Sequence, residues 1–185
     1  YDGWAATYDE AMAVAGYRHP AICLALLARH LPRGAAPLLD AGAGTGLIGD
    51  WLGIMGYPHV EALDISPGML ERARAKGVYK AYHCLALGNP LPFETGRFAG
   101  IVSAGVFTTG HVGPEGLDEL VRACRPGGIL VLTVKTTLWD GGFAAHVAGF
   151  EQRGLIERKE TTDPYVSMPG EAGTVPSLAV VLRRT

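Results

Sequence analysis

Residues Leu38–Gly49, with the sequence LLDAGAGTGLIG, carry the clearest indication of fold class in this chain of 185 residues. Two leucines lead into an acid, and glycines then stand at every second position, at Gly42, Gly44 and Gly46. Behind them apolar residues recur at helical spacing: Leu47, Ile48, Trp51, Leu52 and Met55. This order predicts a strand over 37–41, a tight glycine loop and a helix over 45–55.

Two acidic residues accompany this loop. Asp40 directly precedes it, and Asp64 ends a strand-like run about 20 positions further on, where the acid that grips a ribose diol is expected. Glycine lets a ligand lie against bare backbone, and a strand that enters a helix through such a loop is the usual nucleoside site of α/β proteins. Asp40 does not suit a pyrophosphate, which seeks free N–H groups, but it suits a cationic group such as an ammonium.

Strands and helices alternate along most of the chain. Further strands are predicted over 59–64, 78–84, 98–103 and 129–134, and helices over 1–30 with a break at 16–20, from Ser66 to Gly77, from Pro114 and over 141–153. Residues 126–128 are predicted as a turn. The last two strands, 155–162 and 178–183, follow each other without a helix, which predicts an antiparallel pair. The sequence therefore predicts one domain over 1–185, a three-layer α/β Rossmann-like, doubly wound sheet, mostly parallel with a reversed C-terminal hairpin.

Composition narrows the functional classes. The formal net charge is −2 and there is no basic run, so we expect no nucleic-acid partner. No apolar run approaches the roughly 20 residues that cross a bilayer, so we expect no membrane partner. The three scattered cysteines predict reduced thiols and a cytoplasmic protein. The chain begins with Tyr1 rather than Met, which leaves a preceding segment open, and nothing in it indicates an oligomeric state.

The glycine loop resembles motif I of the class I S-adenosylmethionine-dependent methyltransferases, in which two hydrophobic residues precede Asp-x-Gly-x-Gly-x-Gly. Other segments resemble later landmarks of that family: 62–70, 90–93 and 125–128. The opening residues resemble the first helix of members that act on small molecules: Tyr1, Asp2, Trp4, Ala5, Tyr8 and Asp9. Within the family, Tyr17, Arg18 and the segment 164–177 most resemble the Williams–Beuren-region type.

The resemblance implies S-adenosylmethionine as the cofactor, in a crevice at the carboxyl ends of the strands. It gives the methionine end to Asp40, Gly42 and Gly44, the ribose to Asp64, and the adenine to Ile65 and Met69. It makes 1–20 a lid from which Tyr8 and Arg18 reach the methionine carboxylate. The carboxyl ends of the strands and the loops after them supply the other expected cofactor-binding residues: Ala41, Thr45, Gly46, Ser66, Leu85, Ala86, Leu87, Ser103, Ala104 and Gly105. Family members often carry an Asp where this chain has Ala86, so backbone groups or Asn89 are expected to hold the adenine amino group.

Methyl transfer needs a positioned nucleophile rather than a metal or a covalent catalyst, and the sequence shows no metal-ligand cluster. In the loop 105–111, His111 has the side chain suited to a general base near neutral pH. This loop lacks Asn-Pro-Pro-Tyr and Pro-Cys, which disfavours adenine-N6, glutamine-amide and cytosine-C5 methylation. We expect a small, uncharged or apolar acceptor, with Trp139, Tyr165 and Met168 as candidate lining residues.

Two other functions stay open from the sequence. A nicotinamide (NAD(P))-dependent Rossmann oxidoreductase shares the glycine loop and Asp64, although the glycine spacing, Asp40 and the terminal hairpin count against it. A non-catalytic S-adenosylmethionine-binding module also fits, because Ala86 departs from the family pattern and no base is obvious. Stabilisation by NADH alone would favour the first alternative, and binding without formation of S-adenosylhomocysteine the second.

Overall fold

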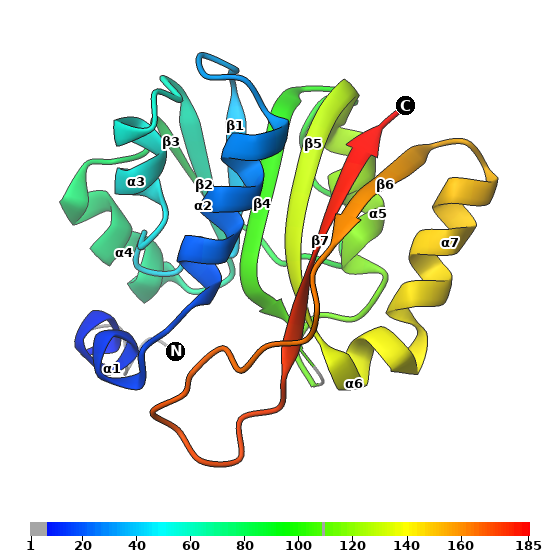
Figure 1. The fold of residues 1–185 in the computed structure, drawn as a ribbon. Coiled ribbons are helices and arrows are strands. Elements are labelled where there is room, and N and C mark those ends of the chain that lie inside the picture. The colour runs from blue at the N-terminus through cyan, green and yellow to red at the C-terminus, as the bar shows by residue number, and fades with distance from the viewer. Residues whose placement is uncertain (1–6, 109) are drawn as a thin grey trace.

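A computed structural model describes residues 7–108 and 110–185, so Tyr1, Asp2, Trp4 and Ala5 lie outside the described residues. Seven strands form one sheet in the order β3-β2-β1-β4-β5-β7-β6 (Figure 1). They are β1 (Leu38–Ala41), β2 (Val60–Asp64), β3 (Ala81–Cys84), β4 (Phe98–Phe107), β5 (Cys124–Lys135), β6 (Ile156–Thr161) and β7 (Ser177–Arg184). Neighbours from β3 to β5 pair in parallel, and β7 pairs antiparallel with both β5 and β6. The predicted fold class is confirmed.

Helices cover both faces of this sheet (Figure 1). They are α1 (Tyr8–Ala15), α2 (His19–His30), α3 (Gly49–Ile54), α4 (Pro67–Lys76), α5 (Gly116–Ala123), α6 (Thr136–Leu138), the π-helical turn η1 (Trp139–Phe143) and α7 (Ala144–Gln152). One core cluster joins α2, α3 and α4 to the sheet, and the other joins α5 and α7 to its opposite face. The strands between these layers are buried on both sides, as their near-continuous apolar runs require.

Several element boundaries differ from the prediction; β3, for example, begins at Ala81 rather than at residue 78. Helix α3 begins at Gly49 rather than at residue 45, because Gly44 and Gly46 have positive φ and keep the loop out of helical geometry. Strand β4 runs on to Phe107. Residues 126–128 are part of β5 and form no separate turn. There the register slips between the pairs Phe98–Cys124 and Gly100–Ile129, a bulge that Gly127 accommodates with φ of +77°.

The segment between β6 and β7 meets the break between α1 and α2. The N–H of Arg18 donates to the carbonyl of Ser167 at 2.9 Å, and the N–H of Gly170 donates to the carbonyl of Ala15 at 3.1 Å. Figure 1 shows this link and α1 beyond the end of the sheet where β4 finishes. Two segments far apart in sequence thus border the edge at which an open α/β sheet binds its ligands.

Within the described residues, no individual helix is long and apolar enough to span a membrane. The pair α1 and α2 passes that test only when taken together, across a bend of 83°.

Candidate functional site

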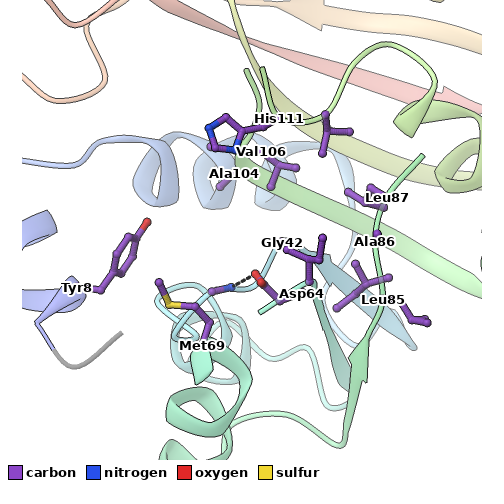
Figure 2. Close-up of a pocket in the computed structure, with 15 residues that line it drawn as sticks. Tyr8, Gly42, Asp64, Met69, Leu85, Ala86, Leu87, Ala104, Val106 and His111 are labelled. Carbon is purple, nitrogen blue, oxygen red and sulfur yellow. Dashed lines mark hydrogen bonds between the residues drawn. The ribbon is translucent and has the colours of Figure 1, made fainter. Parts of the chain in front are cut away.

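A cavity of about 220 Å³ opens at the carboxyl ends of β1, β2 and β4 (Figure 2). Its lining comes from α1, the glycine loop, the ends of β2 and β4, α4 and the segments that follow β3 and β4. The lining residues are Tyr8, Gly42, Gly44, Leu63, Asp64, Ile65, Met69, Leu85, Ala86, Leu87, Ala104, Gly105, Val106, His111 and Val112. Eleven of the predicted site residues therefore share one cavity: Tyr8, Gly42, Gly44, Asp64, Ile65, Met69, Leu85, Ala86, Leu87, Ala104 and Gly105, with the predicted base His111 beside them.

Asp64 ties the glycine loop to the end of β2. Its Oδ2 accepts the N–H of Gly44 at 2.8 Å (Figure 2), and its Oδ1 accepts the N–H of Ser66 at 2.9 Å. The N–H groups of Gly42 and Ala43 both donate to the carbonyl of Leu63. A carboxylate oxygen has two lone pairs, so each oxygen of Asp64 keeps one acceptor site beyond its backbone bond.

The glycines of the loop serve different purposes. Gly42 has φ of +86°, and a Cβ there would collide with Cγ2 of Val106. Gly44 has φ of +54°, and among the described residues no atom beyond Gly44 and its chain neighbours lies within 4 Å of the position that a Cβ would take. Because Gly44 lines the cavity, that empty space belongs to the cavity. Gly42 thus permits close packing of the loop on β4, whereas Gly44 leaves bare backbone beside the space for a ligand.

One side of the cavity is apolar and suits a flat ring. Leu85 and Leu87 lie across the cavity from Tyr8 in Figure 2, and the buried Met69 lies near Asp64. Ile65 is 65% exposed, which leaves its side chain available to a ligand. Ala86 contributes no side-chain hydrogen bond to this wall. Asn89, its expected substitute, is exposed and does not line the cavity.

The N-terminal helix α1 is fastened over the cavity by Asp9. Its carboxylate accepts hydrogen bonds from the hydroxyl of Thr45 and, at 2.6 Å, from the ammonium of Lys76. These bonds join α1 to the glycine loop and to α4, and they bring Tyr8 to the cavity. Arg18 is exposed, and its guanidinium donates to the carbonyl of Val166 at 3.4 Å. Its side chain therefore contacts the link between β6 and β7 and does not line the cavity.

Asp40 lies beneath the glycine loop. It is 1% exposed, and its Oδ2 accepts the hydroxyl of Tyr79 at 2.6 Å. Burial raises the pKa of Asp40 to about 7; the bond from Tyr79 opposes this rise and the charge of Asp64 adds to it. Asp40 therefore supports the loop from below and does not line the cavity.

The other predicted residues outside the lining have structural partners. Ser103 donates its hydroxyl to the carbonyl of Ala41 at 2.7 Å, in the buried pairing of β4 with β1. Ser66 caps α4 by accepting the N–H of Met69 at 3.1 Å. Thr45 is buried against Asp9, and a Cβ on Gly46 would lie 3.1 Å from the ring of Tyr79. The predicted residues that do not line the cavity are Arg18, Asp40, Ala41, Thr45, Gly46, Ser66 and Ser103.

Asp40→Asn should stabilise the protein at high pH and not at low pH. The pKa of Asp40 is raised in the folded state, so stability is lost as pH rises from about 4 through about 7, the folded value. Asparagine has no charge to bury, so its advantage should grow over that interval to at most about 4 kcal/mol. Thermal unfolding at pH 5 and pH 8 measures this difference in stability between the variant and the wild type, with the exposed Asp50→Asn as control. A melting difference that is equal at both pH values would contradict the assignment.

Sequence reasoning missed part of the site. Leu63, Val106 and Val112 line the cavity next to predicted residues, but apolar side chains carry no chemical signal of their own. Of the expected acceptor residues, Trp139 stacks on Phe143, and Tyr165 hydrogen-bonds to Nδ1 of His19 at 2.7 Å.

Cys23 and Cys124 are buried free thiols, and Cys84 is exposed. Across 7–108 and 110–185, no three His, Cys, Asp or Glu side chains lie where they could hold a metal ion.

Comparison with known proteins gives the context of this geometry. Residues 39–132 match a family model described as a methyltransferase domain. The human methyltransferase-like protein 27 is 37% identical over 164 residues, which cover 85% of this chain and 66% of that protein. The matched regions span between 32% and 66% of the length of the curated relatives.

Solved structures share the fold. A TehB-like S-adenosylmethionine-dependent methyltransferase from Corynebacterium glutamicum superposes with a TM-score of 0.70 at 24% identity, covering 100% of this chain and 98% of that one. Geranyl diphosphate C-methyltransferase from Streptomyces coelicolor, solved with Mg²⁺, geranyl diphosphate and S-adenosyl-L-homocysteine, gives 0.65 at 13% identity over 89% and 78% of the two chains.

Proposed function

The chain belongs to the methyltransferase domain family of class I S-adenosylmethionine-dependent enzymes, and from that membership we propose that it transfers a methyl group to a small-molecule acceptor. The observation that carries the proposal is the cavity itself, in which the bare backbone of Gly44 and the carboxylate of Asp64 face the same space. The family match favours this function over a nicotinamide-dependent oxidoreductase.

The residues present fit S-adenosylmethionine. We infer that the free acceptor sites of Asp64 bind the ribose hydroxyls and that Leu85, Leu87 and Met69 pack on the adenine. Gly42 and Gly44 then face the methionine part, with Asp40 supporting the loop beneath them. S-adenosylmethionine brings an activated methyl group on its sulfonium, so the chain has to position the acceptor and exclude water.

The lid and the base belong to the same proposal. We treat 1–185 as one domain in which α1, fastened through Asp9, covers the cofactor. His111 reaches the cavity from the segment after β4, opposite Met69 in Figure 2, where its imidazole can orient the acceptor and accept its proton. We also infer a cytoplasmic location, since the three cysteines show no disulfide spacing. We infer no nucleic-acid partner, since the chain carries no basic run, and no membrane partner, since no apolar run approaches the roughly 20 residues that cross a bilayer.

The test is methyl transfer from labelled S-adenosylmethionine to a panel of small phenols, thiols, amines and carboxylic acids. We expect S-adenosylhomocysteine to form with at least one class and His111→Gln to lower the rate by about 10²-fold or more without changing cofactor affinity. Native mass spectrometry of the freshly purified protein adds a direct readout, because a retained nucleoside identifies itself by mass. Saturable cofactor binding with no product across the panel would instead support a non-catalytic binding module.

A further inference from the structure

A second hollow, of about 320 Å³, opens beside the cofactor cavity. Its lining comes from the segment after β4, the end of β5 and the link between β6 and β7: Thr108, Lys135, Thr137, Met168, Glu171, Ala172, Gly173, Thr174 and Val175. Since β4 and β5 run in parallel, their carboxyl ends meet at the same edge of the sheet. The hollow therefore lies on the side of β4 away from Asp64 and the expected adenine wall.

The two hollows share no lining residue, but each has lining residues at the exit of β4. Ala104, Gly105 and Val106 line the cofactor cavity, and Thr108 lines the second hollow. The carbonyl of Thr108 accepts the N–H of His111 at 3.1 Å, so a residue of each hollow is held in the same turn. A small molecule that extends from the second hollow past Thr108 would therefore approach His111 and the cofactor cavity.

Lys135 is the cationic group of this hollow. It ends β5, is half-buried, and donates to the carbonyl of Val175 at 2.8 Å and to the hydroxyl of Ser167 at 3.3 Å. An ammonium has three N–H donors, and in the described part of the chain the third has no partner. Burial lowers the pKa of Lys135, and the charge of Glu171 opposes that change. A bound anion would complete the hydrogen bonding of this ammonium and offset its partial desolvation.

No salt bridge neutralises Lys135 among the described residues. Glu171 lines the same hollow and is exposed, and its charge acts on Lys135 without an ion pair within 4.0 Å. His19, on the inner side, is buried and bonded to Tyr165. Burial lowers the pKa of His19 to about 3, and the charge of Lys135 contributes to this shift, so the imidazole stays neutral. The positive charge at the end of β5 is thus directed into the hollow.

We propose that the second hollow binds the non-reacting end of the methyl acceptor and that Lys135 binds a carboxylate on that end. This rests on the proposed methyltransferase function and replaces the expected uncharged or apolar acceptor with an acidic one. No local pattern predicts this site, because Lys135 meets the residues of 167–175 only in the folded chain.

The test measures binding of matched acids and amides to the protein saturated with S-adenosylhomocysteine. The probes are three matched pairs: benzoate and benzamide, 4-hydroxybenzoate and 4-hydroxybenzamide, and hexanoate and hexanamide. Ligand-observed NMR measures the dissociation constant of each. A charge-assisted hydrogen bond should make the acids bind about tenfold more tightly than their amides. Lys135→Gln should abolish this preference, Lys135→Arg should retain it, and Glu171→Gln should strengthen binding of the acids.

Lys159→Gln is the matched control, since Lys159 pairs with Glu157 on the exposed face of β6. It should leave the preference unchanged. Equal binding of acids and amides to the wild-type complex would overturn the proposal, as would a preference that survives Lys135→Gln. The affinity of each variant for S-adenosylhomocysteine is measured separately, so loss of cofactor binding, which would count against the proposed function, is distinguished from loss of the acid preference.

Discussion

Gly44→Val is expected to weaken binding of S-adenosylhomocysteine by about a hundredfold or more while the protein remains folded. A Cβ on residue 44 would point into space that holds no atom of the other described residues within 4 Å, apart from its chain neighbours, and Gly44 lines the cavity. A valine side chain would therefore occupy the volume that the ligand needs, at a cost of about 3 kcal/mol or more in binding. Isothermal titration gives the affinity, and far-ultraviolet circular dichroism checks the fold.

The positive φ of Gly44 requires its own control, because any L-residue is strained there. Gly34→Val provides this control. Gly34 has φ of +81°, and among the described residues no atom beyond its chain neighbours lies within 4 Å of its Cβ position. It lies in the turn before β1, outside the cavity. Both variants should lose similar stability, and only Gly44→Val should lose the ligand. Full affinity in Gly44→Val would show that the loop is a turn and no part of a binding site.

Asp64→Ala is expected to weaken binding of S-adenosylhomocysteine by about 1–3 kcal/mol, roughly 5- to 150-fold. The substitution removes the proposed ribose acceptors and also leaves the N–H groups of Gly44 and Ser66 without their partner. Asp64→Asn keeps one acceptor oxygen, so its loss should be smaller. The exposed Asp50→Asn, on α3 close to the loop, controls for the change in charge.

Asp64→Ala could weaken binding through distortion of the glycine loop or through loss of contacts to the ribose, and a second ligand distinguishes these two causes. The wild-type protein should bind S-adenosylhomocysteine more tightly than its 2′-deoxy analogue, and Asp64→Ala should bind the two equally. An Asp64→Ala variant that still discriminates between them would mean that another group holds the ribose.

The local chemistry of the chain predicted most of the sheet. The alternation of apolar runs with glycine and proline located the strands along the chain, and the last two strands without a helix between them predicted the reversed β7. Boundaries were wrong where long-range pairing decided them, as in β5, which continues through 126–128 because Cys124 finds a partner in Phe98. Sequence periodicity does not reveal a bulge that forms against a strand about 25 residues away.

The strand, glycine loop and helix, and the position of Asp64 at the end of β2, follow from the amino-acid sequence alone, because backbone φ preferences and strand periodicity are local properties. Which acid faces the cavity depends on contacts that form only in the folded chain. Asp40 and Asp64 both lie near the carboxyl ends of their strands, β1 and β2, but Tyr79 approaches from a distant part of the chain and bonds Asp40 beneath the loop. The fold likewise brought Lys135 to the link between β6 and β7. A side chain's partners depend on segments that meet only when the sheet is assembled, which is why such contacts cannot be inferred from local pattern alone.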